Sequence, residues 1–301
     1  MLRWRIILGA ILIAALMGLC WLDDNVGRPG IVLLPLAVVL AMLAAGELLA
    51  MIRQRGYDPL AWVVYGGTLF TVFAAAAPGL FPSLPEGSGT GRLGWLAIGL
   101  AASFLLAAVG ELQRFDAPGS AMMNFALAVF AIVYVGGLLG FLIQLRLLGG
   151  EADDLHDHTG MFALGSLIAI VKMSDIGQYT VGRLVGRHKL APRVSPGKTW
   201  EGFLGGLVFA CLAAWLITGF APALTNGGAK SSLALAFVYA IALASAGVVG
   251  DLTESLLKRD AGVKDSSNWL PGFGGILDLL DSLLGAAPVA YFFWALHLVG
   301  P

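Results

Sequence analysis

The chain alternates long uncharged stretches with short polar ones. Eight stretches lack Asp, Glu, Lys and Arg and are 17 residues or longer: 6–22, 29–46, 59–85, 93–110, 117–145, 202–229, 231–250 and 282–301. A helix that crosses a bilayer needs about 20 mostly apolar residues. A ninth stretch, 158–171, continues past Lys172 and Asp175 and predicts a span that carries charges. Because uninterrupted apolar runs lack the alternation of barrel strands, we predict an all-α, polytopic integral membrane protein with about nine transmembrane helices.

The composition agrees with a membrane protein and excludes some functions. Charged residues make up 12% of the 301 residues and hydrophobic residues 58%, whereas soluble domains are about 25% charged. The net charge of −1 excludes a globally basic nucleic-acid binder. Cys20 and Cys211 both lie in apolar runs, so neither a disulfide framework nor a cysteine metal site is expected.

The distribution of Lys and Arg predicts the orientation in the membrane. With the N-terminus in the cytoplasm, 13 cations fall in cytoplasmic segments and four on the opposite side, as the positive-inside rule requires. We expect residues 6–22 to be an uncleaved first helix rather than a signal peptide. Residues 1–150 form an N-terminal region of about five helices in this interpretation. Residues 151–301 form a C-terminal catalytic region whose polar loops face the cytoplasm at the inner (plasma) membrane.

Two polar loops on the predicted cytoplasmic side stand out, at 181–201 and 251–281, and we expect them to converge in space. In the first, Ser195-Pro-Gly-Lys198-Thr199 predicts a Pro-Gly turn just before a helix, where backbone N–H groups and a lysine could bind an anion. The alternative is a basic loop that only obeys the positive-inside rule. On the opposite side, the acidic segment 151–158, with His156 and His158, looks like a metal site, but we expect a solvated loop because nothing there supplies the fixed geometry of a catalytic metal.

The second loop carries carboxylates at helical spacing. Asp251, Ser255 and Lys258 follow each other at i, i+4 and i+7 and so share one helical face. Asp278 and Asp281 are at i and i+3, and paired aspartates suit Mg²⁺; their alternative role is favourable charge at a helix N-terminus. Within the ninth span, ionisable groups are costly; Asp175 is expected to be functional because it points toward the basic loop, while the role of Lys172 stays open. A mutual ion pair that only joins helices is the other interpretation of that pair.

The residues from Ser255 to Asp281 resemble the signature of the phosphatidate cytidylyltransferases, also called CDP-diacylglycerol synthases. That signature is S-x-x-K-R-x4-K-D, a turn P-x-H-G-G, and D-R-x-D. The matching positions are Ser255, Lys258, Arg259, Lys264, Asp265, Pro271, Gly274, Gly275, Asp278 and Asp281. Upstream, Ser174-Asp175, Gly186-Arg187-His188-Lys189 and Ser195-Pro-Gly-Lys198-Thr199-Trp200-Glu201-Gly202 are similar to the same family. Phe273 and Leu279 stand where the family has His and Arg.

The resemblance implies transfer of CMP from CTP to phosphatidate, which gives CDP-diacylglycerol and pyrophosphate for phospholipid biosynthesis. It implies that Asp251, Asp278 and Asp281 hold Mg²⁺ against the triphosphate, with Lys258, Asp278 and Asp281 as catalytic residues. The substrate-binding residues that it implies are Asp175, Arg187, His188, Ser195, Lys198, Thr199, Ser255, Arg259, Lys264 and Asp265. The partners would be CTP, phosphatidate and membrane lipid.

Two other classes fit parts of the pattern. A CTP-dependent kinase or a cytidylyltransferase acting on another membrane lipid would share the anion chemistry. A transporter would use Lys172 and Asp175 for translocation, but it should contain two repeated halves with broken helices, and no such repeat is seen. The sequence leaves the acyl preference and the oligomeric state open, a homodimer included.

Overall fold

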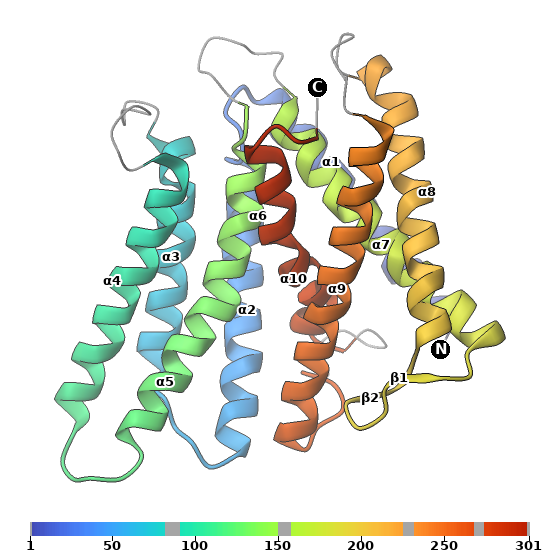
Figure 1. The fold of residues 1–301 in the computed structure, drawn as a ribbon. Coiled ribbons are helices and arrows are strands. Elements are labelled where there is room, and N and C mark those ends of the chain that lie inside the picture. Colours follow the sequence, from blue (N-terminus) through green and yellow to red (C-terminus); the bar gives the residue numbers. More distant parts are fainter. Residues whose placement is uncertain (1, 82–90, 150–157, 225–231, 268–273, 300–301) are drawn as a thin grey trace. The chain divides into compact units, whose positions relative to one another are not determined.

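The computed structural model describes residues 2–81, 91–149, 158–224, 232–267 and 274–299. The described residues form nine helical rods and one β-hairpin (Figure 1). The rods are α1 (Leu2–Asn25), α2 (Leu33–Gln54), α3 (Ala61–Leu80), α4 (Gly91–Arg114), the continuous α5 (Ala121–Ala131), η1 (Ile132–Gly137) and α6 (Leu138–Arg146), α7 (Thr159–Val185), α8 (Trp200–Leu224), α9 (Leu233–Ala261) and α10 (Ile276–Ala295). The hairpin strands are β1 (Lys189–Ala191) and β2 (Ser195–Thr199).

The helices confirm the predicted fold class. Each rod covers one of the nine apolar stretches of the sequence, and η1 is a π-helical stretch inside the fifth rod. Within the described residues, eight of the rods are long and apolar enough to cross a membrane. The protein is therefore a polytopic, all-α integral membrane protein. The acidic segment 151–157 and Phe273 lie outside the described residues.

The predicted polar loops are shorter than expected because three helices extend into them. α7 continues to Val185, α9 continues to Ala261, and α10 begins at Ile276. The predicted Pro-Gly turn is wrong: Pro196 and Gly197 lie inside β2. The turn instead follows Ala191, with Pro192 at its second position and a hydrogen bond from the Val194 N–H to the Ala191 carbonyl of 3.2 Å. Proline favours that position of a turn, and an edge strand tolerates its missing N–H.

The chain divides into two compact units, and each has its own packing. Unit 1 contains Met1–Leu147 and Asp260–Leu279, and unit 2 contains Leu148–Arg259 and Leu280–Pro301. In unit 1, α3 and α4 lie side by side (Figure 1). A Cβ atom on Gly99 of α4 would come within 3.2 Å of the α3 backbone at Thr71. Small residues of this kind let membrane helices approach closely.

Unit 1 also contains a buried ion pair at the end of α6. Arg146 Nε lies 2.7 Å from Asp23 Oδ2, and the two side chains are 5% and 0% exposed. The Asp23 carboxylate also accepts the backbone N–H groups of Gly30, Val32 and Leu33. This carboxylate therefore joins α1, the start of α2 and the end of α6 into one structure.

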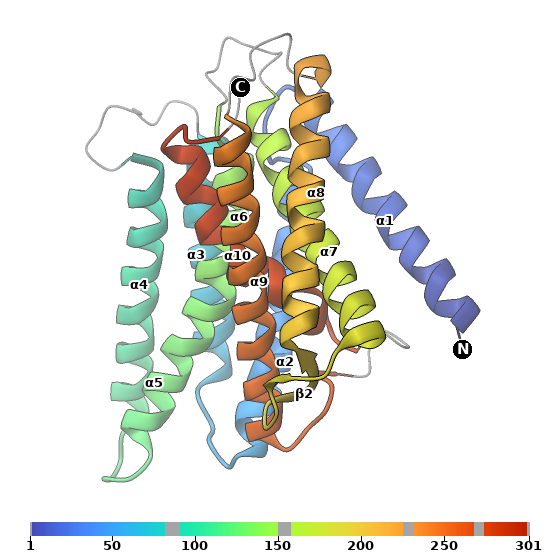
Figure 2. The ribbon, with the colours of Figure 1, turned by 45° about the vertical axis from the view of Figure 1, so that its right-hand side comes forward.

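In unit 2, α7 and α8 pack through glycines. Cβ atoms on Gly177, Gly205 and Gly206 would each collide with the facing helix. The β-hairpin lies at the ends of these two helices (Figure 2). In this hairpin Lys189 pairs with Thr199 and Ala191 with Ser195, in antiparallel register. The close packing of α7 and α8 therefore holds the ends of the hairpin beside both helices.

Candidate active site

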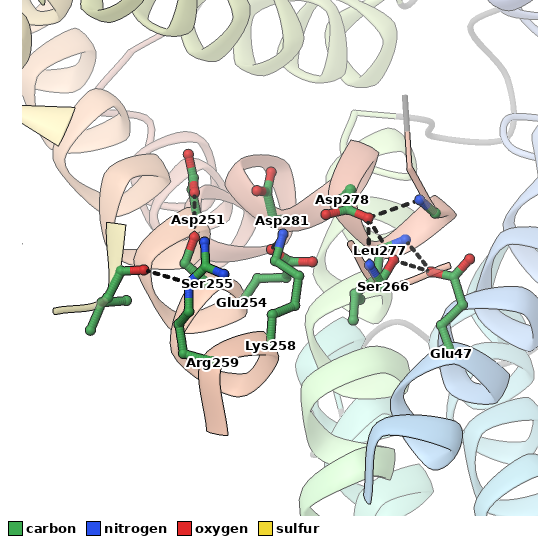
Figure 3. A network of polar contacts seen from close by, with 12 residues as sticks. Glu47, Asp251, Glu254, Ser255, Lys258, Arg259, Ser266, Leu277, Asp278 and Asp281 are labelled. Carbon is green, nitrogen blue, oxygen red and sulfur yellow. Dashed lines mark hydrogen bonds and ion pairs between the residues drawn. The ribbon is translucent and has the colours of Figure 1, made fainter. Parts of the chain in front are cut away.

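Two aspartates of unit 2 are brought together by the close approach of α9 and α10. A Cβ atom on Gly250 would collide with the Asp281 carbonyl and with the backbone of Gly285. Only glycine allows the two helices to meet at this distance. Asp251, the residue after Gly250, therefore lies within electrostatic range of Asp281, and their side chains point to the same side in Figure 3.

Asp251 also binds a lysine and a serine. Lys198 Nζ, which comes from β2, lies 2.7 Å from Asp251 Oδ2. The Ser255 hydroxyl donates to Asp251 Oδ1 over 3.3 Å, one helical turn along α9. The structure thus unites two residues of the second predicted loop with the lysine of the first. The lysine side chain is only 17% exposed, so the fold holds this cation in place.

The charged pair of α7 belongs to the same group of residues. Lys172 Nζ lies 3.4 Å from Asp175 Oδ2. Asp175 is in electrostatic range of Asp251 and Lys198, and Lys172 is in range of Asp281. Unit 2 thus gathers three carboxylates and two ammonium groups, which we call the α7–α9–α10 cluster: Lys172, Asp175, Lys198, Asp251 and Asp281. Among the described residues, no three His, Cys, Asp or Glu side chains are close enough to hold one metal ion together.

Lys258 has a partner that the sequence analysis missed. Its ammonium forms an ion pair with Glu254, one turn earlier on α9, and the Glu254 side chain is fully buried. The i, i+4 spacing of the two residues could have indicated this pair. The neighbouring Arg259 donates from Nε to the Val194 carbonyl over 3.2 Å, which ties α9 to the hairpin (Figure 3).

The remaining predicted residues of the first loop shape the hairpin. Glu201, at the start of α8, accepts the backbone N–H groups of Arg187 and His188 and lies 2.6 Å from His188 Nδ1. Thr199 Oγ1 accepts the Gly202 N–H over 3.1 Å and so caps α8. Ser195 is half-buried, while the Arg187 side chain is exposed. Substrate contacts by these residues stay predictions.

The aspartate that opens α10 has a different environment, in unit 1. One carboxylate oxygen of Asp278, Oδ2, accepts the Ser266 N–H, the Ser266 hydroxyl and the Gly275 N–H, at 2.7 to 2.9 Å. Asp278 therefore caps its own helix, which was the alternative role that the sequence left open. Its role as a metal ligand stays a prediction.

Other residues of the segment before α10 fall outside these networks. Lys264 and Asp265 of the predicted site lie exposed between α9 and α10. Leu279, which stands where the family has Arg, is half-buried. Substrate contacts by Lys264 and Asp265 stay predictions.

Glu47 of α2 belongs to the hydrogen-bond network around Asp278 (Figure 3). The sequence analysis did not select this residue. Its carboxylate accepts the Ile276 and Leu277 N–H groups, each at 2.9 Å. It also accepts the Ser266 and Ser267 hydroxyls, at 2.8 and 2.7 Å. The only signal in the sequence was a glutamate near the polar end of a predicted span. We call Glu47, Ser266, Ser267, Gly275 and Asp278 the α10 cap.

The fold defines the class: a polytopic integral membrane protein, in which unit 2 gathers carboxylates and lysines into one cluster. The chain belongs to the cytidylyltransferase family, whose sequence profile matches residues 3–297. Among similar proteins, a phosphatidate cytidylyltransferase of Brucella suis is 31% identical over 299 residues, which cover 98% of this chain and 94% of the relative.

Two further relatives carry the same name and match over a shorter region. The Haemophilus influenzae phosphatidate cytidylyltransferase is 40% identical over 163 residues, 54% of each chain. The one from Pseudomonas aeruginosa is 49% identical over 137 residues, which cover 44% of this chain and 49% of the relative. These two matches span about half the length of the relatives.

Proposed function

We propose that the protein transfers CMP from CTP to phosphatidate, releases pyrophosphate and forms CDP-diacylglycerol. The observation that carries the proposal is the α7–α9–α10 cluster, where Lys198 and Asp251 come from the two predicted polar loops and meet at 2.7 Å. Membership of the cytidylyltransferase family and the names of the relatives support the same reaction.

The nucleophile in this reaction needs little activation. Phosphatidate is a phosphate monoester, and the second pKa of such a group is about 6, so it is already an anion at neutral pH. The difficulty is to bring two polyanions together and to stabilise the charge of the transition state. Lys198, Lys258 and Arg259 are the cations that we assign to the phosphates. Ser195 and Ser255 are assigned as hydrogen-bond donors.

The residues of the cluster also fit Mg²⁺. Mg²⁺ is commonly held by one or two carboxylates, with water and substrate phosphates as the other ligands. Asp251 and Asp281 offer such oxygens from two helices that meet at Gly250. When bound, the ion would neutralise phosphate charge as a Lewis acid. In the protein alone, Lys198 balances the charge of Asp251, and we assign the same lysine to the triphosphate.

We further propose that the site faces the cytoplasm from the inner membrane, where CTP is available. The support is the charge distribution, with 13 cations on the predicted cytoplasmic side against four on the other. A cysteine placed at Lys189 of the hairpin tests it, with a cysteine at Arg92 as the matched control. An impermeant reagent added to intact cells should label the Arg92 variant and spare the Lys189 variant; the reverse pattern would contradict the orientation.

The reaction itself is tested with purified protein in lipid nanodiscs and CTP labelled at the α-phosphorus. Label should enter an organic-soluble product only when phosphatidate and Mg²⁺ are both present, and chelation of Mg²⁺ should stop it. Folded protein that forms no labelled lipid under these conditions would refute the proposal.

A further inference from the structure

The carboxylate of Glu47 binds the N-terminus of α10 and has no assigned part in the proposed reaction. Its two oxygens take the N–H groups of Ile276 and Leu277, which are among the first four of α10 and have no partner inside the helix. The N-terminus of a helix carries a partial positive charge, and a carboxylate is favourable there. Ionisable groups within apolar membrane helices are costly and are by default functional.

The surrounding backbone is shaped to accept this carboxylate. A Cβ atom on Gly275 would collide with the Ser266 hydroxyl and with both carboxylate oxygens of Glu47. Gly274 has a φ of +88°, a conformation that residues with a Cβ rarely adopt, and a Cβ there would meet the Asp278 carboxylate. The two glycines that precede α10 are therefore required by the α10 cap.

We propose that Glu47 is a positioning residue for Asp278. It binds the first N–H groups of α10 and shares the Ser266 hydroxyl with Asp278, so it fixes the first turn of the helix and the direction of the Asp278 carboxylate. The inference rests on the proposed function, because the family resemblance assigns Asp278 to Mg²⁺ in that reaction. Groups that orient metal ligands typically contribute about 10- to 100-fold to metal affinity or activity.

The test compares Glu47→Gln with Glu111→Gln. Glu111 is a matched control, since it lies in Gly-Glu-Leu near the end of α4, as Glu47 does in α2. Three properties are measured for each: amide hydrogen exchange at Ile276 and Leu277, the Mg²⁺ concentration that gives half of the Mg²⁺-induced thermal stabilisation, and kcat for CMP transfer. The first two need no turnover, so they separate this inference from the proposed reaction.

Glu47→Gln should speed exchange at Ile276 and Leu277 by about tenfold or more, because charge-assisted hydrogen bonds are lost. The Mg²⁺ concentration for half stabilisation should rise about tenfold and kcat should fall by a similar factor. Glu111→Gln should match the wild type in all three. Faster exchange with an unchanged Mg²⁺ response would mean that Glu47 only stabilises the helix end, and would overturn the inference. Unchanged exchange in Glu47→Gln, or a wild type whose stability does not respond to Mg²⁺, would also overturn it.

If Glu47→Gln does not fold, Ser267→Ala keeps the inference testable. This change removes one hydrogen bond to Glu47 and leaves both carboxylates in place. It should raise the Mg²⁺ concentration for half stabilisation about threefold, in proportion to the smaller loss. Wild-type values in this variant, together with wild-type exchange at Ile276, would overturn the inference.

Discussion

The burial of the ion pair between Glu254 and Lys258 sets how much stability each substitution in this pair should remove. The Glu254 side chain is 0% exposed and that of Lys258 is 12% exposed. Removing one partner of a buried pair costs about 3 to 5 kcal/mol, because the other charge is left without compensation, whereas replacing both by uncharged groups is often neutral. Lys258→Met leaves the more buried charge behind, so it should destabilise more than Glu254→Gln. The double variant should be more stable than Lys258→Met.

Thermal unfolding of the detergent-purified protein measures this order. For a chain of this size, a change of 1 kcal/mol shifts the melting temperature by about 2 °C. We expect Lys258→Met to melt about 6 to 10 °C below the wild type, and the double variant to recover at least about 4 °C of that loss. The two variants that lack Lys258 should lose CMP transfer, because Lys258 is assigned to the phosphates. A double variant that melts as low as Lys258→Met would refute the assignment of a compensating buried pair.

Two more predictions concern other parts of the chain. Arg146→Leu leaves the fully buried Asp23 without its cation, so the free energy of unfolding should fall by about 3 to 5 kcal/mol. CMP transfer by the folded fraction should stay at the wild-type rate. An unchanged melting temperature would contradict this prediction. The double change Phe273→His and Leu279→Arg should alter kcat less than tenfold, because an ionised phosphate needs no proton removed. A protein that is inactive without the double change and active with it would show that the natural chain is not a working cytidylyltransferase.

The sequence was sufficient to locate the helices, because the backbone groups of each span must form their hydrogen bonds within that span. A membrane helix pairs all its backbone groups internally, so length and apolarity locate it, as they did for all nine rods. The helical spacing of Asp251 and Ser255 also predicted their contact. The turn was misplaced because two prolines compete in that loop, and Pro192 rather than Pro196 occupies the turn.

The part that could not be predicted depends on contacts between distant segments. Asp278 and Asp281 share a helical face by spacing, which favoured one common metal site. In the structure, Asp278 accepts hydrogen bonds from Ser266 and Gly275. The neighbouring Glu47, which binds Ile276, is 229 residues earlier in the chain. Spacing within one helix says nothing about such a partner. For the same reason, the sequence could not predict that Lys198 pairs with Asp251, although the two polar loops were expected to converge.

The central claim is that the protein moves the α-phosphorus of CTP, with its nucleoside, onto a lipid phosphate. The most direct test gives the protein CTP labelled at either the α- or the γ-phosphorus, with phosphatidate and Mg²⁺, and follows the label into lipid. The account predicts lipid label from α-labelled CTP only, and a loss of about 100-fold or more in Asp281→Asn. Lipid label from γ-labelled CTP would identify a CTP-dependent kinase instead, and would contradict the account.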